Sequence, residues 1–226
     1  MKIPVARNIL SANDQIAADN RALFDRLGVF VVNLMASPGA GKTSVILTTA
    51  ERLPKPVRPG VIEGDLASRI DADTIAARSI PVVQINTGGG CHLDAPMVRR
   101  ALPELPLQEI DLLFIENVGN LVCPAEFKLG ANLAVVVASA PEGHDKSYKY
   151  PGMFAAADAV ILNKADLLQV FEFDVDYFRR GIEMLNPAVP FFPLSCRTGA
   201  GVDAWLHWLL EKQSLFTEDR KQPIVV

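Results

Sequence analysis

Apolar runs rich in β-branched residues recur along the chain, and amphipathic segments separate them. The apolar runs are predicted to be strands at 29–37, 57–65, 81–87, 111–119, 133–140, 158–166 and 190–195. The amphipathic segments between them are predicted to be helices at 43–53, 67–78, 95–102, 175–185 and 202–211. Continuous apolar strands that alternate with helices are typical of a parallel sheet covered on both faces. The pattern therefore predicts an α/β fold with a mostly parallel sheet.

One more amphipathic segment, "NDQIAADNRALFDRLG", precedes the first apolar run. It is expected to be a helix with Asn13 as its N-cap and Gly28 as its C-terminal stop. At the other end, the polar and then apolar stretch "TEDRKQPIVV" is expected to be loosely held. The chain is accordingly divided into a helical lead-in at 1–28, a main domain at 29–213 and a C-terminal tail at 214–226.

The stretch "ASPGAGKTS" follows the first apolar run and opens a predicted helix, which is the context of a phosphate-binding P-loop. Glycine allows backbone N–H groups to approach phosphates closely, a lysine reaches the β- and γ-phosphates, and a hydroxyl ligates Mg²⁺. Ala36 holds the place where the usual pattern has glycine. The predicted phosphate-binding residues are Pro38, Gly39, Ala40, Gly41, Lys42, Thr43 and Ser44.

A second motif, "NKAD" at Asn163–Asp166, follows another apolar run and indicates guanine as the base. The Asp166 carboxylate can accept two hydrogen bonds from guanine, and adenine offers no matching donor pair. The Asn163 side chain is expected to meet the base edge and the Lys164 stem to pack on the ring. Ser195 and Cys196 are expected to bring a loop backbone to the guanine carbonyl. An ordinary strand-to-helix turn is the alternative interpretation.

Two acids stand at predicted strand ends, where open α/β sheets bind ligands. Asp65 ends "VIEGD", and Glu116 lies in "FIENVGN". We expect both to serve Mg²⁺, although either could instead be a helix cap or a turn acid. With Lys42 and Thr43 they form the predicted catalytic set for hydrolysis of a nucleoside triphosphate.

The stretch "TGGGCHLDA" places three glycines before Cys91 and His92, and Cys123 lies a few residues beyond Glu116. Neighbouring side chains of a regular helix diverge, whereas a glycine-rich loop lets them converge. Thiolate and imidazole ligands suit Zn²⁺ or Ni²⁺. The alternative is a glycine turn beside a buried thiol and a surface imidazole.

Composition narrows the function classes. The 226 residues carry a formal net charge of −4, which gives no support to nucleic-acid or anionic-membrane binding. No apolar run approaches the roughly 20 residues that a membrane span needs. Three cysteines, an odd and sparse number, favour a reducing compartment over a disulfide framework. The cytoplasm is the expected location, without membrane insertion.

The sequence resembles the hydrogenase nickel-incorporation GTPase family, HypB. The matching segments are "VNLMASPGAGKTS", "VIEGDLAS", "QINTGGGCHLDA", "LLFIENVGNLVCPAEFKLG", "EGHDKSYKYPGMF" and "ILNKADLL". The resemblance implies a SIMIBI-type G domain that binds and slowly hydrolyses GTP, with Mg²⁺, and helps deliver nickel to nickel–iron hydrogenase. It also implies a homodimer promoted by nucleotide or metal, a small zinc-containing partner of the HypA type and the precursor of the hydrogenase large subunit as target.

By position, the resemblance makes Cys91, His92 and Cys123 metal ligands of the G domain. Lys146 and Lys149 of "EGHDKSYKYP" are expected to reach the nucleotide or the partner subunit as the dimer closes. His144 stands where relatives often have an acid, and the residues before the P-loop contain no Cys or His, unlike the nickel-storage tracts of many relatives.

Three other functions remain possible from the sequence alone. The related urease nickel GTPases share the P-loop and base motif but have their own Cys-Pro-His type motif. A P-loop kinase would not require the guanine motif or the cysteines. A nucleotide-gated metal-binding protein would hydrolyse GTP only incidentally. Competition between GTP and ATP separates the kinase from the first function, and metal affinity with GDP and with a GTP analogue separates the gated metal-binding protein from it.

Overall fold

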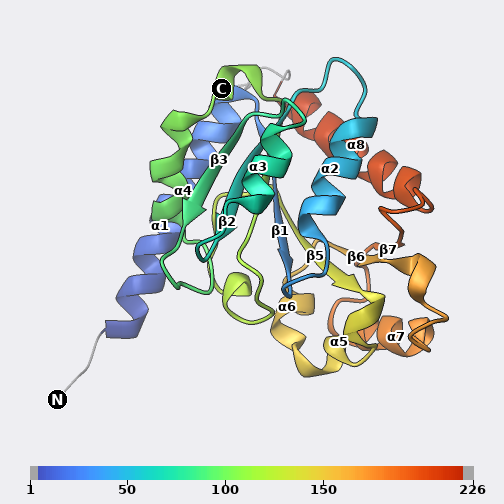
Figure 1. Ribbon diagram of the computed structural model, residues 1–226. Coiled ribbons are helices and arrows are strands. Elements are labelled where there is room, and N and C mark those ends of the chain that lie inside the picture. The colour runs from blue at the N-terminus through green and yellow to red at the C-terminus, as the bar shows by residue number, and fades with distance from the viewer. Residues whose placement is uncertain (1–4, 221–226) are drawn as a thin grey trace.

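Seven parallel strands form one sheet in a computed structural model that describes residues 5–220 (Figure 1). The strand order is β3-β2-β4-β1-β5-β6-β7. The strands are β1 (Phe30–Ala36), β2 (Pro59–Asp65), β3 (Val82–Asn86), β4 (Leu112–Glu116), β5 (Leu133–Ser139), β6 (Ala159–Asn163) and β7 (Phe191–Pro193). Each falls within a predicted apolar run, so the α/β class and the parallel sheet are confirmed.

Eight α-helices connect the strands or flank the sheet in the described part of the chain. They are α1 (Val5–Leu27), α2 (Lys42–Arg52), α3 (Ile70–Ala76), α4 (Ala95–Ala101), α5 (Lys146–Lys149), α6 (Pro151–Ala155), α7 (Val175–Leu185) and α8 (Val202–Asp219). The two short helices α5 and α6 were not predicted, because four or five residues are too few for a helical period to emerge. None of the helices within 5–220 is long and apolar enough to cross a membrane.

The sheet is covered on both faces, and alternate residues of β1 show how. Val32 and Leu34 belong to the core beneath α2, α3 and α8, whereas Val31 faces α1 and α4. Met35 lies in a third apolar cluster that packs under α6 and α7. Figure 1 shows α1 beside α4 on one side of the molecule and α2 beside α8 on the other. Helices on both faces explain why the strands are apolar along their whole length.

Helix α1 begins earlier than the sequence predicted, and the expectation that Asn13 caps it is wrong. Asn13 is buried inside the helix, where its amide donates to the carbonyl of Lys128 and accepts from the N–H of Ala95, both at 2.9 Å. A buried amide with two tertiary partners contributes more than an end-cap, which explains why the helix runs past it. Gly28 follows the helix with φ of 80°, so its predicted role as the stop is confirmed.

Helix α8 runs to Asp219, so the boundary predicted between residues 213 and 214 lies inside a continuous helix. Its apolar face continues beyond that point, since the rings of Phe216 and Phe30 lie 5.4 Å apart. Deeper in the core, the Trp205 indole N–H donates to the Thr49 hydroxyl at 3.0 Å and locks α8 onto α2. Residues 221–226 of the predicted tail lie outside the described residues.

Candidate nucleotide and metal site

The phosphate loop connects β1 to α2 at the carboxyl edge of the sheet. Gly39 and Gly41 have φ of 77° and 99°, and Gly41 is the N-cap of α2. This left-handed backbone turns successive N–H groups toward one point, as an anion-binding loop requires. The loop lies at the N-terminus of an 11-residue helix, which adds favourable partial charge for phosphate. Lys42 begins that helix and is mostly buried.

A pocket of about 290 Å³ lies beside the phosphate loop at the ends of β6 and β7. Asp166 is exposed on its wall, and Lys164, Ser195 and Cys196 also line it. All four were predicted from the sequence to surround a guanine base. The Lys164 ammonium donates to the carbonyl of Gly39 at 2.8 Å, so the base pocket and the phosphate loop adjoin.

The buried side chain of Asn163 connects the base pocket to the phosphate loop. Its Nδ2 donates to the carbonyl of Ala40 at 3.0 Å, and its Oδ1 accepts from the N–H groups of Lys164 and Cys196. Its contact with the base edge stays a prediction. The Asn163 side chain also requires glycine at position 41, because a Cβ there would come within 2.4 Å of its amide nitrogen.

Glu116 ends β4 directly beside the phosphate loop. The Thr43 hydroxyl donates to its Oε1 at 2.8 Å, while its Oε2 is buried without a hydrogen-bond partner among the described residues. Burial raises the pKa of Glu116 to about 7, against the opposing effects of Lys42 and the Thr43 hydroxyl. A buried carboxylate oxygen with no donor, next to a hydroxyl, is chemically suited to a hard cation such as Mg²⁺.

Glu63 is a buried acid that the sequence analysis missed. It lies on β2 as the register partner of Glu116, is 1% exposed, and also has an unpartnered Oε2 within the described chain. Burial, and then the charge of Glu116, raise its pKa to about 8. The available signal was an acid in the middle of the apolar run "GVIEGD", where both faces of the strand are covered.

Asp65 ends β2 but shows the alternative role that the sequence left open. Its Oδ1 accepts from the N–H groups of Ala67 and Ser68 at 2.8 and 2.6 Å, which is a turn formed by the side chain itself. Its carboxylate is partly exposed at the same sheet edge as Glu116. Coordination of Mg²⁺ by Asp65 therefore stays a prediction.

Cys91, His92 and Cys123 converge, as the glycine-rich loop predicted. One ligand atom from each lies within 4.8 Å of the others, and the two sulfurs are 2.9 Å apart. The His92 ring stacks on Phe127 with centroids 3.9 Å apart, which fixes its orientation. The adjacent Cys91 thiol raises the pKa of Cys123. Two thiols and one imidazole form a soft donor set that fits Zn²⁺ or Ni²⁺ and leaves one tetrahedral position for another ligand.

Local hydrogen bonds from side chain to backbone shape both segments that carry these ligands. Asp94 caps α4 by accepting from Met97 at 2.7 Å, so the first segment ends in a helix immediately after His92. In the second segment, the Asn120 side chain accepts from the N–H groups of Val122 and Cys123 at 2.7 and 3.1 Å. These bonds predispose the loops to present their ligands to one point.

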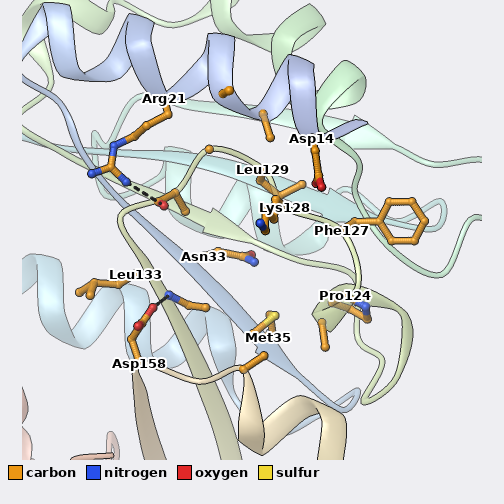
Figure 2. A pocket seen from close by; sticks show the side chains of 17 residues that line it. Asp14, Arg21, Asn33, Met35, Pro124, Phe127, Lys128, Leu129, Leu133 and Asp158 are labelled. Carbon is orange, nitrogen blue, oxygen red and sulfur yellow. Dashed lines mark hydrogen bonds between the residues drawn. The ribbon is translucent and has the colours of Figure 1, made fainter. Parts of the chain in front are cut away.

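A cavity of about 440 Å³ lies behind the second segment, between α1 and the sheet. Figure 2 shows Asn33 and Met35 of β1 on its floor, with Phe127 and Pro124 at one end. The Arg21 guanidinium donates to the carbonyl of Ala131 at 3.1 Å, the bond drawn at the left of Figure 2. The segment that follows Cys123 is therefore attached to α1 at its far end, and its Ala125 and Leu129 pack with apolar clusters that include strand residues.

The fully buried Asn117 connects the nucleotide side to the metal side. Its Oδ1 accepts from the N–H groups of Leu93 and Val118, both at 3.0 Å, and its Nδ2 donates to Asn33 at 3.2 Å. Leu93 directly follows His92. One amide next to Glu116 therefore holds the first metal segment, and sequence reasoning did not single it out.

The phosphate loop and the segment 116–123 are also in direct contact. A Cβ on Gly119 would lie 2.9 Å from the Cα and N atoms of Pro38, so only glycine fits there. The N–H of Asn120 donates to the carbonyl of Ala36 at 2.7 Å. The phosphate loop and residues 119–120 are therefore packed and hydrogen-bonded to each other without a gap.

A further network joins the phosphate loop to the segment that carries Lys146 and Lys149. Glu142 accepts from the hydroxyls of Ser37 and Ser139. Both lysines form ion pairs with Asp145 in this structure. Their expected reach to a nucleotide or a partner subunit would require these partly exposed pairs to open, which costs least for the exposed Lys149 because solvent screens its pair.

The strand order, the phosphate loop and the adjoining pocket define a P-loop nucleotide-binding protein, and comparison with known proteins agrees. The family model CobW/HypB/UreG, nucleotide-binding domain, matches residues 30–193. The hydrogenase maturation factor HypB of Azotobacter vinelandii is 50% identical over 205 residues, which cover 91% of this chain and 68% of that protein.

Two solved structures are also similar. HypB from Helicobacter pylori in complex with nickel has 39% identity and a TM-score of 0.86, with 95% of this chain and 99% of that chain covered. HypB from Archaeoglobus fulgidus has 35% identity and a TM-score of 0.84, with 90% and 99% covered. The chain belongs to the HypB family of hydrogenase maturation factors, a branch of the CobW/HypB/UreG P-loop GTPases.

The base pocket yields a test of nucleotide choice. Replacing Asp166 by alanine is expected to weaken GTP binding much more than ATP binding, because only guanine uses the paired acceptor oxygens. Calorimetric titration of both nucleotides into wild type and Asp166→Ala measures this. Equal losses for the two nucleotides would show that Asp166 does not read the base.

The raised pKa of Glu63 yields a test of stability against pH. Its folded-state pKa of about 8 exceeds the ordinary value of 4.5, so the folded protein binds the proton more tightly than the unfolded chain. Without metal or nucleotide, stability should therefore be highest below pH 4.5 as far as this group is concerned and should fall as pH rises toward 8.

Glu63→Gln removes this titrating group, so its stability should fall less than that of the wild type between about pH 5.5 and about pH 8.5. Chemical unfolding in EDTA at both pH values measures the difference. Asp71→Asn, on α3, is the control: Asp71 is only a minor cause of the raised pKa of Glu63, so this variant should stay close to wild type. Parallel pH curves for wild type and Glu63→Gln would contradict the assigned pKa.

Proposed function

We propose that this chain binds and hydrolyses GTP and uses the nucleotide state to hold or release nickel during maturation of nickel–iron hydrogenase. The observation that carries the proposal is the bridge from Glu116 to Cys123. It starts at the carboxylate that accepts from Thr43, touches the phosphate loop at Gly119 and ends at a sulfur 2.9 Å from Cys91. Nickel is the cargo in this proposal, and Zn²⁺ is the alternative occupant of the same donor set.

The proposed role of each side chain in hydrolysis follows from where it lies relative to the phosphate loop. Lys42 begins α2 behind the phosphate loop and would stabilise charge on the transferred phosphate. Thr43 and Glu116, joined by their hydrogen bond, would hold Mg²⁺, and Asp65 would join them from the neighbouring β2. The ion held there would supply positive charge that neutralises the charge developing on the phosphates. Slow turnover is expected, because a regulatory GTPase spends most of its cycle in one nucleotide state.

Coupling between the two sites would run through Asn117 and the contact at Gly119. The first metal segment is held by the bond from Leu93 to Asn117, and the second begins at the contact of Gly119 with Pro38. A shift of residues 116–120 on γ-phosphate binding would therefore move both segments by different paths. The metal would meet a different ligand geometry in the GTP and GDP states.

Assembly is the remaining part of the proposal. Three ligands per chain leave a coordination position that a second subunit, a small zinc-containing protein of the HypA type or the hydrogenase precursor could fill. Val122, next to Cys123, is 54% exposed, so the metal site is accessible to such a partner. A homodimer promoted by nucleotide or metal is expected, and sedimentation in each nucleotide state measures it; a monomer in every state would count against it.

The location of the hydrolytic site is tested through the lysine of the phosphate loop. Lys42→Ala should abolish phosphate release from GTP while the protein stays folded, since Lys42 acts on phosphate charge rather than in the core. Phosphate release and circular dichroism of wild type and variant measure both parts. Turnover retained in a folded Lys42→Ala protein would place the reaction elsewhere.

Metal affinity measured with GDP and with a non-hydrolysed GTP analogue tests the coupling itself. The wild type should show a difference of about 5- to 150-fold, the usual range for linked sites, and the metal must change nucleotide affinity by the same factor. Cys123→Ala should weaken nickel binding and remove the dependence of the remainder on nucleotide. Equal wild-type affinities in both states would refute nickel release by hydrolysis.

Asn117→Ala should bring the affinity ratio close to one while leaving all three metal ligands in place. The matched control is Asn20→Ala, which removes another fully buried amide that holds metal-flanking segments, through the carbonyls of Ala95 and Leu129. Asn20 bonds to α4 and the 123–131 loop but not to the phosphate side, so its variant should keep the ratio. A similar loss of the ratio in both variants would show general loosening rather than a specific path.

A further inference from the structure

Two buried acids lie side by side where the proposed magnesium site begins. Glu63 and Glu116 are register partners on β2 and β4, and they are 1% and 4% exposed. Each has an Oε2 atom that is buried and lacks a hydrogen-bond partner in the described part of the chain. Burying such an oxygen without a donor or cation is costly, so the pair requires an external partner.

The charges around the pair indicate what that partner is. Lys42 is the cation that acts on both acids, while Asp65 and Asp71 add further negative charge to their surroundings. Lys42 forms no ion pair within 4 Å of a carboxylate in residues 5–220, and its position in the phosphate loop commits it to phosphate. The excess of carboxylate oxygen therefore favours a hard divalent cation with its water.

The strand order places the two acids at different distances from the phosphates. Strand β4 lies between β2 and β1, so Glu63 is one strand farther from the phosphate loop than Glu116. A carboxylate one strand beyond Glu116 is therefore placed to meet a water molecule of an ion held beside Glu116 rather than the ion itself.

We propose that Glu63 is a positioning residue for magnesium: its carboxylate accepts hydrogen bonds from the water ligands of the ion that accompanies the nucleotide. This inference rests on the proposed nucleotide function and adds a residue to it. Mg²⁺ keeps several of its waters in proteins, and residues that orient such ligands affect metal affinity strongly. Glu63 thus acts through water and Glu116, without touching the phosphates.

The test measures how much Mg²⁺ strengthens GDP binding. Calorimetric titration of GDP is performed on the full chain in EDTA and at increasing Mg²⁺, for wild type and Glu63→Gln. The variant should bind Mg²⁺ in the GDP complex about 10- to 100-fold more weakly, as for other residues that orient metal ligands. Its GDP affinity in EDTA should equal that of wild type, because no metal-bound water is then present for Glu63 to orient.

Asp71→Asn is the matched control for charge alone. Asp71 adds negative charge to both acids from α3, so its loss should leave the Mg²⁺ dependence unchanged if water contact is what matters. Equal Mg²⁺ dependence in wild type and Glu63→Gln would overturn the inference. A loss of GDP affinity that is the same with and without Mg²⁺ would also overturn it, because Glu63 would then support Lys42 or the fold.

Two further measurements distinguish a folding defect of the variant, and a failure of the proposed function, from a failure of the inference about Glu63. If Glu63→Gln does not fold, Glu63→Met fills a similar volume without a polar atom and is measured in the same way. The wild type in EDTA reports on the nucleotide function by itself. Failure of the wild type to bind GDP would remove the proposed function, whereas GDP binding with unaltered Mg²⁺ dependence in the variant would remove only the role of Glu63.

Discussion

All seven strands run in one direction, and this constraint determines where chemistry can occur. Parallel strands bring all their carboxyl ends to one edge of the sheet, so the loops that follow β1, β2, β3, β4 and β6 meet there. Segments separated by more than 100 residues become neighbours, as the bond from Asn163 to Ala40 shows. The phosphate loop, the acids and the thiols do not need to be close in sequence, because the sheet itself brings them together.

Buried asparagine side chains connect these loops. Asn117, Asn163, Asn20 and Asn13 each bond to backbone groups from segments far apart in the chain. An amide has both donors and an acceptor, so one side chain can satisfy N–H and carbonyl groups of two loops at once. Regular sheet bonding ends at the strand ends, and backbone groups there would otherwise be buried without partners. The amides thus provide cohesion where the sheet cannot.

The sequence predicted the strands, the phosphate loop and the convergence of Cys91, His92 and Cys123, because each depends on a local pattern or on the rule that strand ends meet. Asn13 was assigned to a cap, since its partners at residues 95 and 128 are distant in sequence. Glu63 was missed for a similar reason: its significance comes from its register with Glu116 on another strand. Tertiary pairing of polar groups leaves no periodic signal along one chain, so it had to be read from the structure.

The contact between Gly119 and Pro38 also determines which relative movements of the phosphate loop and residues 119–120 are resisted. Closely packed atoms resist compression, so this contact can transmit a push from the phosphate loop but not a pull. The hydrogen bond from Asn120 to Ala36 has the opposite property, because it resists separation. Together they make the join between the phosphate loop and residues 119–120 stiff against both compression and separation. With the packing contact alone the join would resist only compression, and with the hydrogen bond alone it would resist only separation. With both, it resists each movement.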